Sequence, residues 1–287
     1  MQSFDAIIIG GGPAGVSAAL YLVRAGLKAA IIENGAGALA RAHQIDNFYG
    51  ISASGTELYA KGLEQARKLG ATVIHGEVVS LEYFDSYVLS LHDDAEQYNA
   101  PAVVLATGIK NITLNIPGLS LLEGHGVSYC AVCDGFFFRK KQVAVLGNGA
   151  YALHEAEYLS HLASSVTILT NGKDGALAEA AGLTVNTKPL AQVVGESKLE
   201  AVQFTDGSTL PLDGLFVALG TADSTDMARK LGAEINGRFI KVNEDGATNL
   251  PGLYAAGDCT GGLLQVSKAV HDGAKAGLAA LKFIRSK

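Results

Sequence analysis

The chain opens on a short apolar run, a glycine-rich turn and a longer segment with helical spacing of its apolar positions. Ala6–Ile9 is continuously apolar and predicts a buried strand, whereas the apolar residues of Ala14–Ala25 recur at helical intervals. Gly26 can end that helix, and a second buried strand, Ala29–Ile32, leads into Glu33. Strand, glycine turn, helix and strand in this order predict a βαβ unit.

The same layout returns in the second half of the chain. Val143–Leu146 predicts a strand, 147–152 a glycine turn, Leu153–Leu162 a helix and Val166–Leu169 another strand. The two copies lie too far apart for the short period of a solenoid, so we interpret them as two domains.

The end of the chain predicts that the second domain is inserted in the first. A short strand, Leu253–Ala256, and a helix from about Gln265 follow the second copy and complete the first. We expect an α/β fold of two Rossmann-like dinucleotide-binding domains, with crossings near Pro117 and Val242. The first domain is then 1–116 with 242–287, and the insert is 117–241. The other predicted elements are a helix at Glu57–Lys68, strands at Val73–Val79, Tyr87–His92 and Val103–Ala106, and a hairpin of Leu190–Val194 with Leu199–Phe204.

Composition narrows the class of protein. Of the 287 residues 48% are hydrophobic and 17% charged, which is typical of a globular protein. The net charge is −6 and the longest basic run is Arg139–Lys141, so neither nucleic acid nor an anionic membrane is expected as a partner. The apolar runs are too short to span a bilayer and the start lacks a signal-peptide pattern. We expect no integral membrane segment and a cytoplasmic location.

The first glycine turn has the spacing of a dinucleotide site. Gly10, Gly12 and Gly15 form G-x-G-x-x-G between a strand and a helix, and Glu33 ends the next strand. In such loops the first glycine allows the turn, the second lets backbone approach a pyrophosphate, and the third lets helix pack on strand. A carboxylate at the position of Glu33 can accept from ribose hydroxyls.

The second glycine turn is degraded. Gly147 and Gly149 remain, but Ala152 replaces the third glycine, and Tyr151 places a large ring where a small residue leaves room for a ligand. The strand that follows ends in Thr-Asn-Gly at 170–172, which offers neither a carboxylate for a 2′-hydroxyl nor an arginine for a 2′-phosphate.

Cys130 and Cys133 form a C-x-x-C that is followed at once by Asp134. No second C-x-x-C or histidine pair completes a zinc site, and Cys259 stands alone. A structural disulfide closing so short a loop adds little stability. A C-x-x-C at the start of a helix favours thiol–disulfide exchange. Asp134 either transfers the proton or is simply an acid of the first helical turn.

Together these motifs resemble the low-molecular-weight thioredoxin reductases over nearly the whole chain. The most specific segments are GGGPAG, C-x-x-C-D-G before the second glycine turn, and LYAAGD near the end. The resemblance implies FAD in the first domain, NADPH in the second, a homodimer, domains that rotate, and a thioredoxin-like dithiol protein as partner.

The resemblance also assigns residues by position. Cys133 is expected against the flavin ring, Cys130 attacks the partner, and Asp134 is the acid–base. Asn47 is expected near the flavin ring and Asp258 at the ribityl chain. The residues expected to bind FAD are Gly10, Gly12, Pro13, Ala14, Gly15, Glu33, Asn34, Asn47, Val78, Thr107, Gly108, Gly257, Asp258, Gln265 and Val266.

The departures from the family concern the reductant. Tyr151 and His154 interrupt the second glycine segment GNGAYALHEA, and the family's H-R-R for the 2′-phosphate is replaced at 170–172. This pattern is similar to members that work without pyridine nucleotide, which use ferredoxin or a second FAD. In the diflavin case Tyr151 stacks on the second flavin; otherwise it is an exposed ring without a ligand. The alternatives are an ordinary NADPH-dependent enzyme and a redox-sensing flavoprotein without turnover.

Overall fold

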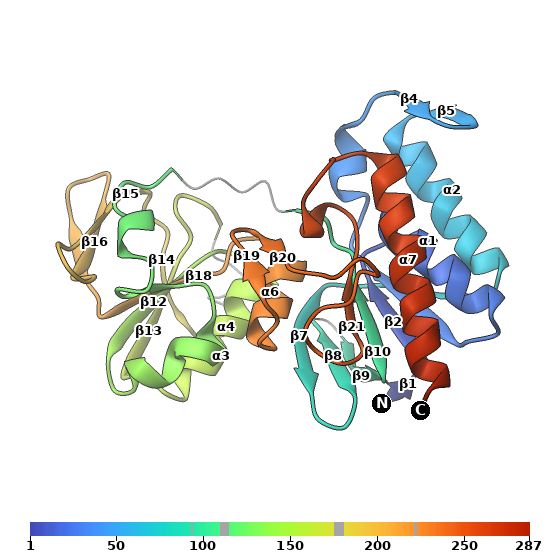
Figure 1. The fold of residues 1–287 in the computed structure, drawn as a ribbon. Helices are drawn as coiled ribbons and strands as arrows, with labels where there is room; N and C mark the ends of the chain where they lie inside the picture. The colour runs from blue at the N-terminus through green and yellow to red at the C-terminus, as the bar shows by residue number, and fades with distance from the viewer. Residues whose placement is uncertain (93, 110–114, 175–180, 221–222) are drawn as a thin grey trace. The chain divides into compact units, whose positions relative to one another are not determined.

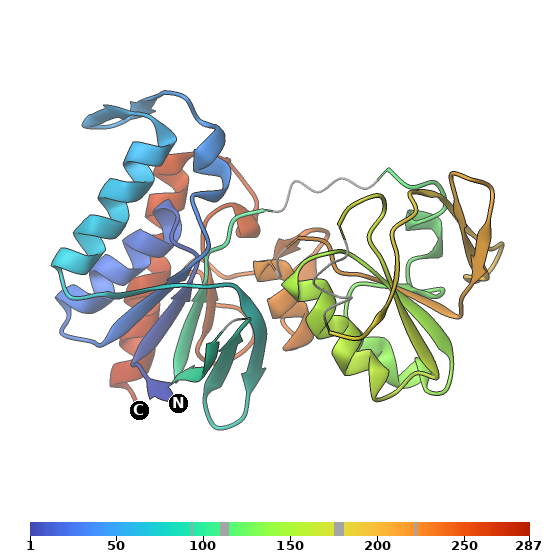
Figure 2. The same cartoon turned by 180° about the vertical axis from the view of Figure 1, so that it is seen from behind.

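The computed structural model describes residues 1–92, 94–109, 115–174, 181–220 and 223–287. The chain divides into two compact units (Figures 1 and 2). Unit 1 is Met1–Lys110 with Asp223–Lys287, and unit 2 is Asn111–Ala222. The first crossing lies close to the one expected near Pro117, whereas the chain returns to unit 1 well before Val242.

The early return has a local cause. The segment after the second crossing forms α6 (Ser224–Lys230) and a small hairpin of β19 (Ile235–Asn236) and β20 (Phe239–Ile240). Ser224 is fully buried and its Oγ accepts from the backbone N–H of Thr107 at 3.0 Å. This contact between hydroxyl-bearing residues far apart in the chain assigns α6 to unit 1, and no local pattern predicts it.

A five-stranded parallel sheet forms the centre of unit 1 (Figure 1). Its order is β21 (Leu253–Ala255), β10 (Ala102–Leu105), β2 (Ala6–Ile9), β3 (Ala29–Glu33) and β6 (Thr72–His75). All residues of β2, β3 and β10 are buried, which explains their uninterrupted apolar runs.

Helices α1 (Pro13–Arg24) and α7 (Val266–Arg285) lie side by side against this sheet (Figures 1 and 2). Their backbones approach closely because glycines face the contact. A Cβ at Gly273 would stand 2.0 Å from the carbonyl oxygen of Ala14. Helix α2 (Gly55–Lys68) begins with a capping box between Ser54 and Glu57.

Unit 1 also contains a four-stranded sheet that lies away from α1 and α7 in both views (Figures 1 and 2). The predicted strand Val73–Val79 is divided between β6 and this sheet, because the chain turns at Gly76 and Glu77. The sheet has the order β1 (Gln2–Ser3), β9 (Asp94–Ala100), β8 (Tyr87–Leu91) and β7 (Val78–Tyr83). Two further elements are a 3₁₀ turn at Gly37–Arg41 and a hairpin of β4 (Ile45–Phe48) with β5 (Ile51–Ala53).

Unit 2 repeats the parallel arrangement. Its sheet has the order β11 (Val127–Ser128), β18 (Gly214–Val217), β12 (Gln142–Leu146), β13 (Ser165–Leu169) and β14 (Thr184–Asn186). A small antiparallel sheet accompanies it, formed by β15 (Leu190–Val194), β16 (Ala201–Phe204) and β17 (Thr209–Pro211). The predicted α/β class with two Rossmann-like units is therefore confirmed.

Two helical segments of unit 2 position the cysteines. Helix α3 (Ala131–Asp134) runs directly into a 3₁₀ turn, Gly135–Phe138. Helix α4 (Ala150–Ser160) packs against α3 and begins earlier than the predicted Leu153. Within the ranges that the structure describes, no helix is both long enough and apolar enough to cross a membrane.

Candidate functional site

The parallel sheet of unit 1 brings four separate segments to one edge. β2, β3, β10 and β21 run in the same direction, so the residues at their carboxyl ends gather there. These residues are Gly10, Glu33, Thr107 and Gly257, all of which the sequence assigns to a dinucleotide site.

The first glycine loop combines tight packing with one open position. Gly10 has φ +118°, and a Cβ there would stand 2.3 Å from the carbonyl oxygen of Ala106. A Cβ at Gly15 would stand 1.8 Å from the carbonyl oxygen of Gly10. A Cβ at Gly12, in contrast, meets nothing within 4 Å. Gly10 and Gly15 are therefore required by the fold, whereas Gly12 leaves space beside the start of α1.

The amino end of α1 fits a pyrophosphate. Gly12 is its N-cap and provides no side-chain hydrogen bond, and Pro13 occupies the first turn. The first-turn N–H groups, including those of Ala14 and Gly15, have no partner within the helix and point to the open position. The loop thus fits the diphosphate of FAD.

Glu33 ends β3, and most of the hydrogen-bond acceptor sites of its carboxylate are occupied by protein groups. Its carboxylate accepts from Gly35 N at 2.9 Å and from the Tyr59 hydroxyl, and it lies 2.9 Å from His75 Nδ1. Burial alone would raise the pKa of Glu33, but the hydrogen bonds from Tyr59, Gly35 and His75 outweigh it and lower that pKa. A carboxylate offers about four acceptor sites, so one remains for a ribose hydroxyl.

The two polar residues expected near the flavin ring meet in the structure. Asn47 on β4 donates through Nδ2 to Oε1 of Gln265 at 2.8 Å, and Gln265 is the N-cap of α7. Asn34 is exposed beside Glu33. Val78 is buried on β7 and can offer a ligand only backbone groups. Their contacts with FAD stay predictions.

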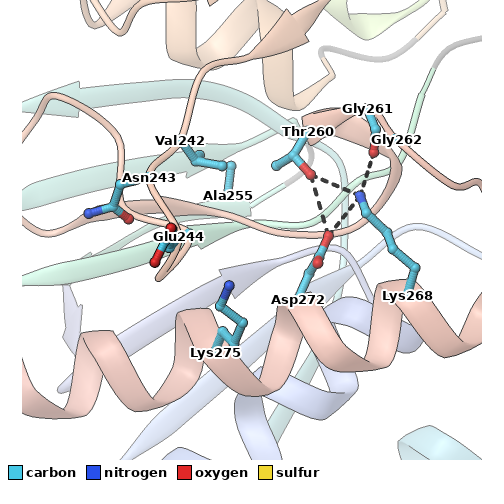
Figure 3. A pocket seen from close by; sticks show the side chains of 11 residues that line it. Val242, Asn243, Glu244, Ala255, Thr260, Gly261, Gly262, Lys268, Asp272 and Lys275 are labelled. Carbon is cyan, nitrogen blue, oxygen red and sulfur yellow. Dashed lines mark hydrogen bonds and ion pairs between the residues drawn. The ribbon is translucent and has the colours of Figure 1, made fainter.

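A lysine that the sequence did not single out fixes the loop before α7. Lys268 Nζ donates to the carbonyl oxygens of Gly257 at 2.7 Å and Gly261 at 2.6 Å, and lies 2.7 Å from Asp272 Oδ2 (Figure 3). The loop between carries Asp258, whose pKa is raised by burial and lowered in part by Lys268. Lys268 therefore holds the predicted ribityl contact in position.

A pocket of about 160 Å³ lies behind this loop (Figure 3). Ligand sites for drug-sized molecules usually have about 300–1,000 Å³, so this pocket is too small for a dinucleotide. Its lining residues are Val242, Asn243, Glu244, Gly246, Ala255, Thr260, Gly261, Gly262, Lys268, Asp272 and Lys275.

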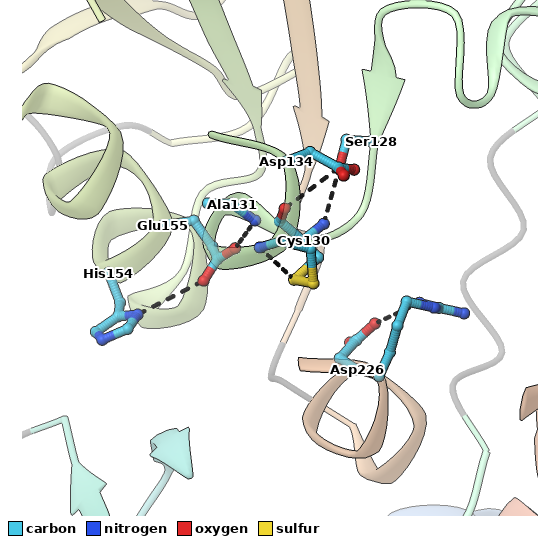
Figure 4. The surroundings of a disulfide bond; sticks show 9 residues. Ser128, Cys130, Ala131, Asp134, His154, Glu155 and Asp226 are labelled. Atoms are coloured by element: carbon cyan, nitrogen blue, oxygen red, sulfur yellow. Dashed lines mark hydrogen bonds and ion pairs between the residues drawn. A yellow bond between two sulfur atoms is a disulfide. The ribbon is translucent and has the colours of Figure 1, made fainter. Parts of the chain in front are cut away.

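The cysteines of unit 2 form a disulfide at the start of α3 (Figure 4). Cys130 is the N-cap residue of α3. The backbone N–H of Cys133 donates to Cys130 Sγ at 3.1 Å. Cys130 is only 3% exposed in this structure, whereas Cys133 is exposed. The predicted place of the C-x-x-C at a helix start is confirmed.

Asp134 is tied to the disulfide through a serine. Ser128 Oγ donates to Asp134 Oδ2 at 2.6 Å, and the same Oγ accepts from the backbone N–H of Cys130 at 3.1 Å (Figure 4). The sequence did not single out Ser128, because a serine ending a two-residue strand carries no motif. Ser128 therefore connects the Asp134 carboxylate to the Cys130 amide, and a role of Asp134 in proton transfer stays a prediction.

Tyr151 is not the exposed ring that one prediction described. The residue is 1% exposed and belongs to the buried face of α4. α4 begins at Ala150, one turn earlier than predicted, so position 151 lies inside the helix instead of in the glycine turn. Stacking on a second flavin stays a prediction, and it requires this ring to become accessible.

The turn after β13 uses its polar side chains internally. Thr170 Oγ1 donates to the carbonyl oxygen of Lys173 at 2.6 Å, and Asn171 Oδ1 accepts from Leu190 N at 2.7 Å. Thr170 thus closes the turn, and Asn171 ties the turn to the start of β15. Throughout the described part of the chain, no three histidine, cysteine or acidic side chains are grouped so as to hold a metal ion.

Comparison with known proteins agrees with this arrangement. The family described as pyridine nucleotide-disulphide oxidoreductase matches residues 4–273. The thioredoxin reductase of Listeria monocytogenes is 35% identical over 98% of this chain and 94% of its own length. The atypical thioredoxin reductase TRi of Desulfovibrio vulgaris superimposes with a TM-score of 0.93 at 38% identity, covering 100% of this chain and 99% of its own.

A ferredoxin-flavin thioredoxin reductase from Clostridium acetobutylicum matches over the full length of both chains, with a TM-score of 0.75 at 30% identity. The strand-end residues of unit 1 (Gly10, Glu33, Thr107 and Gly257, called the FAD edge below), the disulfide and these similarities all indicate the same family. The chain therefore belongs to the pyridine nucleotide-disulphide oxidoreductases, as a flavoprotein of the low-molecular-weight thioredoxin reductase family that acts on sulfur groups.

Proposed function

We propose that this protein exchanges electrons between FAD and the Cys130–Cys133 pair, and between that pair and a thioredoxin-like protein, without NADPH as its reductant. Bound FAD supplies two-electron transfer at the edge formed by Gly12, Glu33 and Asp258. The disulfide accepts two electrons and two protons and becomes a dithiol. A partner disulfide is then reduced through a mixed disulfide, which the second cysteine resolves.

The turn after β13 carries the proposal of NADPH independence. Thr170 is engaged within the turn and Asn171 accepts from the backbone N–H of Leu190 at the start of β15, and no arginine stands at 170–172. A charge-assisted hydrogen bond contributes about 1.5–3 kcal/mol. Loss of two arginine contacts therefore weakens binding of a 2′-phosphate about a hundredfold to ten-thousandfold.

The hydrogen bonds at the disulfide support distinct roles for the two sulfurs. The N–H of Cys133 stabilises a thiolate on Cys130 after reduction, which makes Cys130 the nucleophile toward the partner. Asp134, held by Ser128, takes and returns the proton. Since Cys130 is buried here, its attack on a partner requires a rearrangement that brings its sulfur to the surface.

Exposed aromatic residues beside the disulfide favour a protein as the partner. Phe136 is 66% and Phe137 69% exposed, and Val132 within α3 is exposed as well. Contiguous exposed apolar side chains mark interaction surfaces. This apolar surface suits a thioredoxin-like dithiol protein. We also propose a homodimer, which sedimentation of the purified protein tests.

Ferredoxin and a second FAD are the candidate electron partners. A solved structure at 30% identity is a ferredoxin-flavin thioredoxin reductase, and the exposed cluster Arg139–Lys141 can attract an acidic protein. Tyr151 is buried, so stacking on a second flavin would require its ring to become accessible. We therefore favour ferredoxin with one FAD in each chain.

Three measurements test this function. Flavin released on denaturation should amount to one FAD per chain, and two would establish the diflavin alternative. In anaerobic stopped flow, reduced ferredoxin should bleach the flavin whereas stoichiometric NADPH should not; rapid bleaching by NADPH rejects the proposal. Cys130→Ser should abolish partner reduction, and its persistence would favour a redox sensor without turnover.

One observation supports the NADPH-dependent alternative. Lys173 is an exposed cation directly after the β13 turn, and relatives at 34–35% identity are thioredoxin reductases. If NADPH is used, Lys173→Met should raise the KM for NADPH about tenfold, as loss of one charged contact implies. The KM for NADH should then not change.

A further inference from the structure

A buried carboxylate lies behind the disulfide. Glu155 on α4 is 1% exposed, and its Oε2 accepts from the backbone N–H of Ala131 at 3.0 Å (Figure 4). Ala131 directly follows Cys130 and is the first residue of α3. All of these residues belong to unit 2, so the contact is a property of that unit alone.

His154 lies at the outer side of the same carboxylate. Its Nδ1 stands 3.6 Å from Glu155 Oε1, and its side chain is 32% exposed (Figure 4). The imidazole thus lies between the buried acid and solvent. His154 is also one of the two residues at which this segment departs from the family's pattern.

The surroundings of Cys130 act on its thiolate in opposite directions. The Cys133 N–H donates to Cys130 Sγ and stabilises a negative charge there. The Glu155 carboxylate accepts from the Ala131 N–H, the amide next to Cys130, and in its ionised form it opposes that charge. Because charge–charge interactions are stronger in a buried site than in water, the opposition is appreciable.

We propose that Glu155 is a positioning residue of the Cys130–Cys133 site, whose buried carboxylate holds the Ala131 amide and disfavours the thiolate form of Cys130 in the reduced protein. This inference rests on the proposed redox function of the pair. It implies that Cys130 remains a thiol until its proton passes to the Asp134 carboxylate. Glu155 thereby lowers the reactivity of the reduced site toward electrophiles other than the partner disulfide.

The test isolates the acidity of one sulfur. In the FAD-bound Cys133→Ser protein, Cys130 is alkylated with iodoacetamide between pH 5 and 10, and the product is quantified by mass spectrometry. Cys259 does not interfere, because it is fully buried and its pKa is raised to about 12. The other titratable side chains of 127–134 and α4 are Tyr129, Asp134, Tyr151, His154, Glu157 and Tyr158, and each variant below changes only one of positions 154, 155 and 157.

Glu155→Gln removes the charge but keeps an oxygen that can accept from Ala131 N–H. We expect the alkylation profile to move about one pH unit lower, which is roughly a tenfold faster reaction in the acidic limb. Glu157→Gln, on the exposed face of the same helix, should leave the profile in place. A purely structural role would also leave it in place, so an unchanged profile in folded Glu155→Gln overturns the proposal.

A second pair of variants covers failure of Glu155→Gln to fold. His154→Lys places a permanent cation at the partly exposed side of the carboxylate and should shift the profile in the same direction, about threefold in rate, whereas His154→Gln should not. Absence of that difference overturns the proposal. Alkylation depends on neither electron donor nor partner, so reduction by NADPH would reject the proposed function while leaving this result intact.

Discussion

Single glycines at the FAD edge have separable roles. Gly15 is required by the chain itself, because a Cβ there meets the carbonyl oxygen of Gly10 at 1.8 Å. Gly12 is not, since its φ of −74° suits any residue and a Cβ there meets nothing within 4 Å. The open space at Gly12 is thus explained by a ligand and not by packing.

This difference predicts opposite outcomes for two small substitutions. Gly12→Ala should fold with an unchanged melting temperature but bind FAD roughly ten- to hundredfold more weakly, as lost pyrophosphate contacts imply. Gly15→Ala should lower the free energy of unfolding by about 1–3 kcal/mol through overpacking. Calorimetry of apoprotein and FAD titration measure both. Normal FAD affinity in Gly12→Ala would contradict the assignment of the loop.

The Glu33 cluster predicts a pH-dependent contribution to stability. Since hydrogen bonds lower the pKa of Glu33, its contribution is complete above the unfolded value near 4.5 and is lost as the pH falls through the folded value. Tyr59→Phe should therefore destabilise unit 1 by about 0.5–1.5 kcal/mol at pH 7, and the difference should shrink as the pH falls through the lowered folded pKa of Glu33. Urea unfolding of FAD-saturated protein, followed by flavin fluorescence, measures this.

Tyr21→Phe, on the exposed side of α1, is the matched control and should behave as wild type at every pH. A Tyr59→Phe effect that persists undiminished down to the acid unfolding of the protein would show that the hydroxyl acts independently of the Glu33 charge.

At this scale the sequence predicts residues that carry a motif and misses those that act through a three-dimensional contact. Gly10, Glu33 and Cys133 lie at fixed spacings, so the pattern alone identifies them. Ser128, Glu155 and Lys268 become part of the site only because the fold brings them to Asp134, Ala131 and Gly257. A serine, a helical glutamate and a helical lysine are usually surface residues, and no local signal separates these three from the rest.

Among the elements, α1 and α7 determine the shape of the FAD edge. Both begin at that edge, and they pack through small residues: a Cβ at Gly277 would stand 2.7 Å from the carbonyl oxygen of Ala18. Ser17 Oγ also donates to the carbonyl oxygen of Val270 at 2.7 Å. The position of the first turn of α1 therefore depends on α7, although the two helices lie at opposite ends of the chain.

We expect Gly277→Val to separate these helices. The added side chain should destabilise unit 1 by roughly 3 kcal/mol or more, as clashes with backbone permit little repacking, and should reduce FAD retention in gel filtration. Leu278→Ala, at an exposed position on α7, should change neither property. Full FAD retention in Gly277→Val would show that the two helix starts are positioned independently.

Elements were predicted well where the hydrophobic period was strong. The buried parallel strands β2, β3 and β10 follow from their apolar runs. β9 was missed, because DAEQYNA has polar residues at most of its exposed positions and little apolar alternation. The start of α4 was placed too late because the glycines suggested a longer turn.

At the scale of the whole molecule, two residues of unit 1 that flank the crossings to unit 2 meet in one contact. Thr107 follows β10 shortly before the chain crosses to unit 2, and Ser224 starts α6 just after the chain returns to unit 1. Their hydroxyl oxygens lie 2.8 Å apart, and Ser224 N donates to Thr107 Oγ1 at 2.8 Å. These hydrogen bonds join the part of unit 1 that precedes the first crossing to the part that follows the second.

The contact between Thr107 and Ser224 should matter when the two units exchange electrons. Ser224→Ala removes two hydrogen bonds at the base of both crossings and loosens the attachment of unit 2 to unit 1. Because productive encounter of flavin and disulfide depends on a defined path between the units, we expect single-turnover exchange to slow about three- to tenfold, equivalent to roughly 1 kcal/mol. Thr107 is also among the residues expected to bind FAD, so FAD content is measured in parallel and the exchange rate is compared per bound flavin. Ser267→Ala, an exposed serine of α7, controls for loss of a hydroxyl in the same unit. Equal exchange rates in the two variants would mean that the crossings guide no motion, and that the path between flavin and disulfide is set by contacts elsewhere.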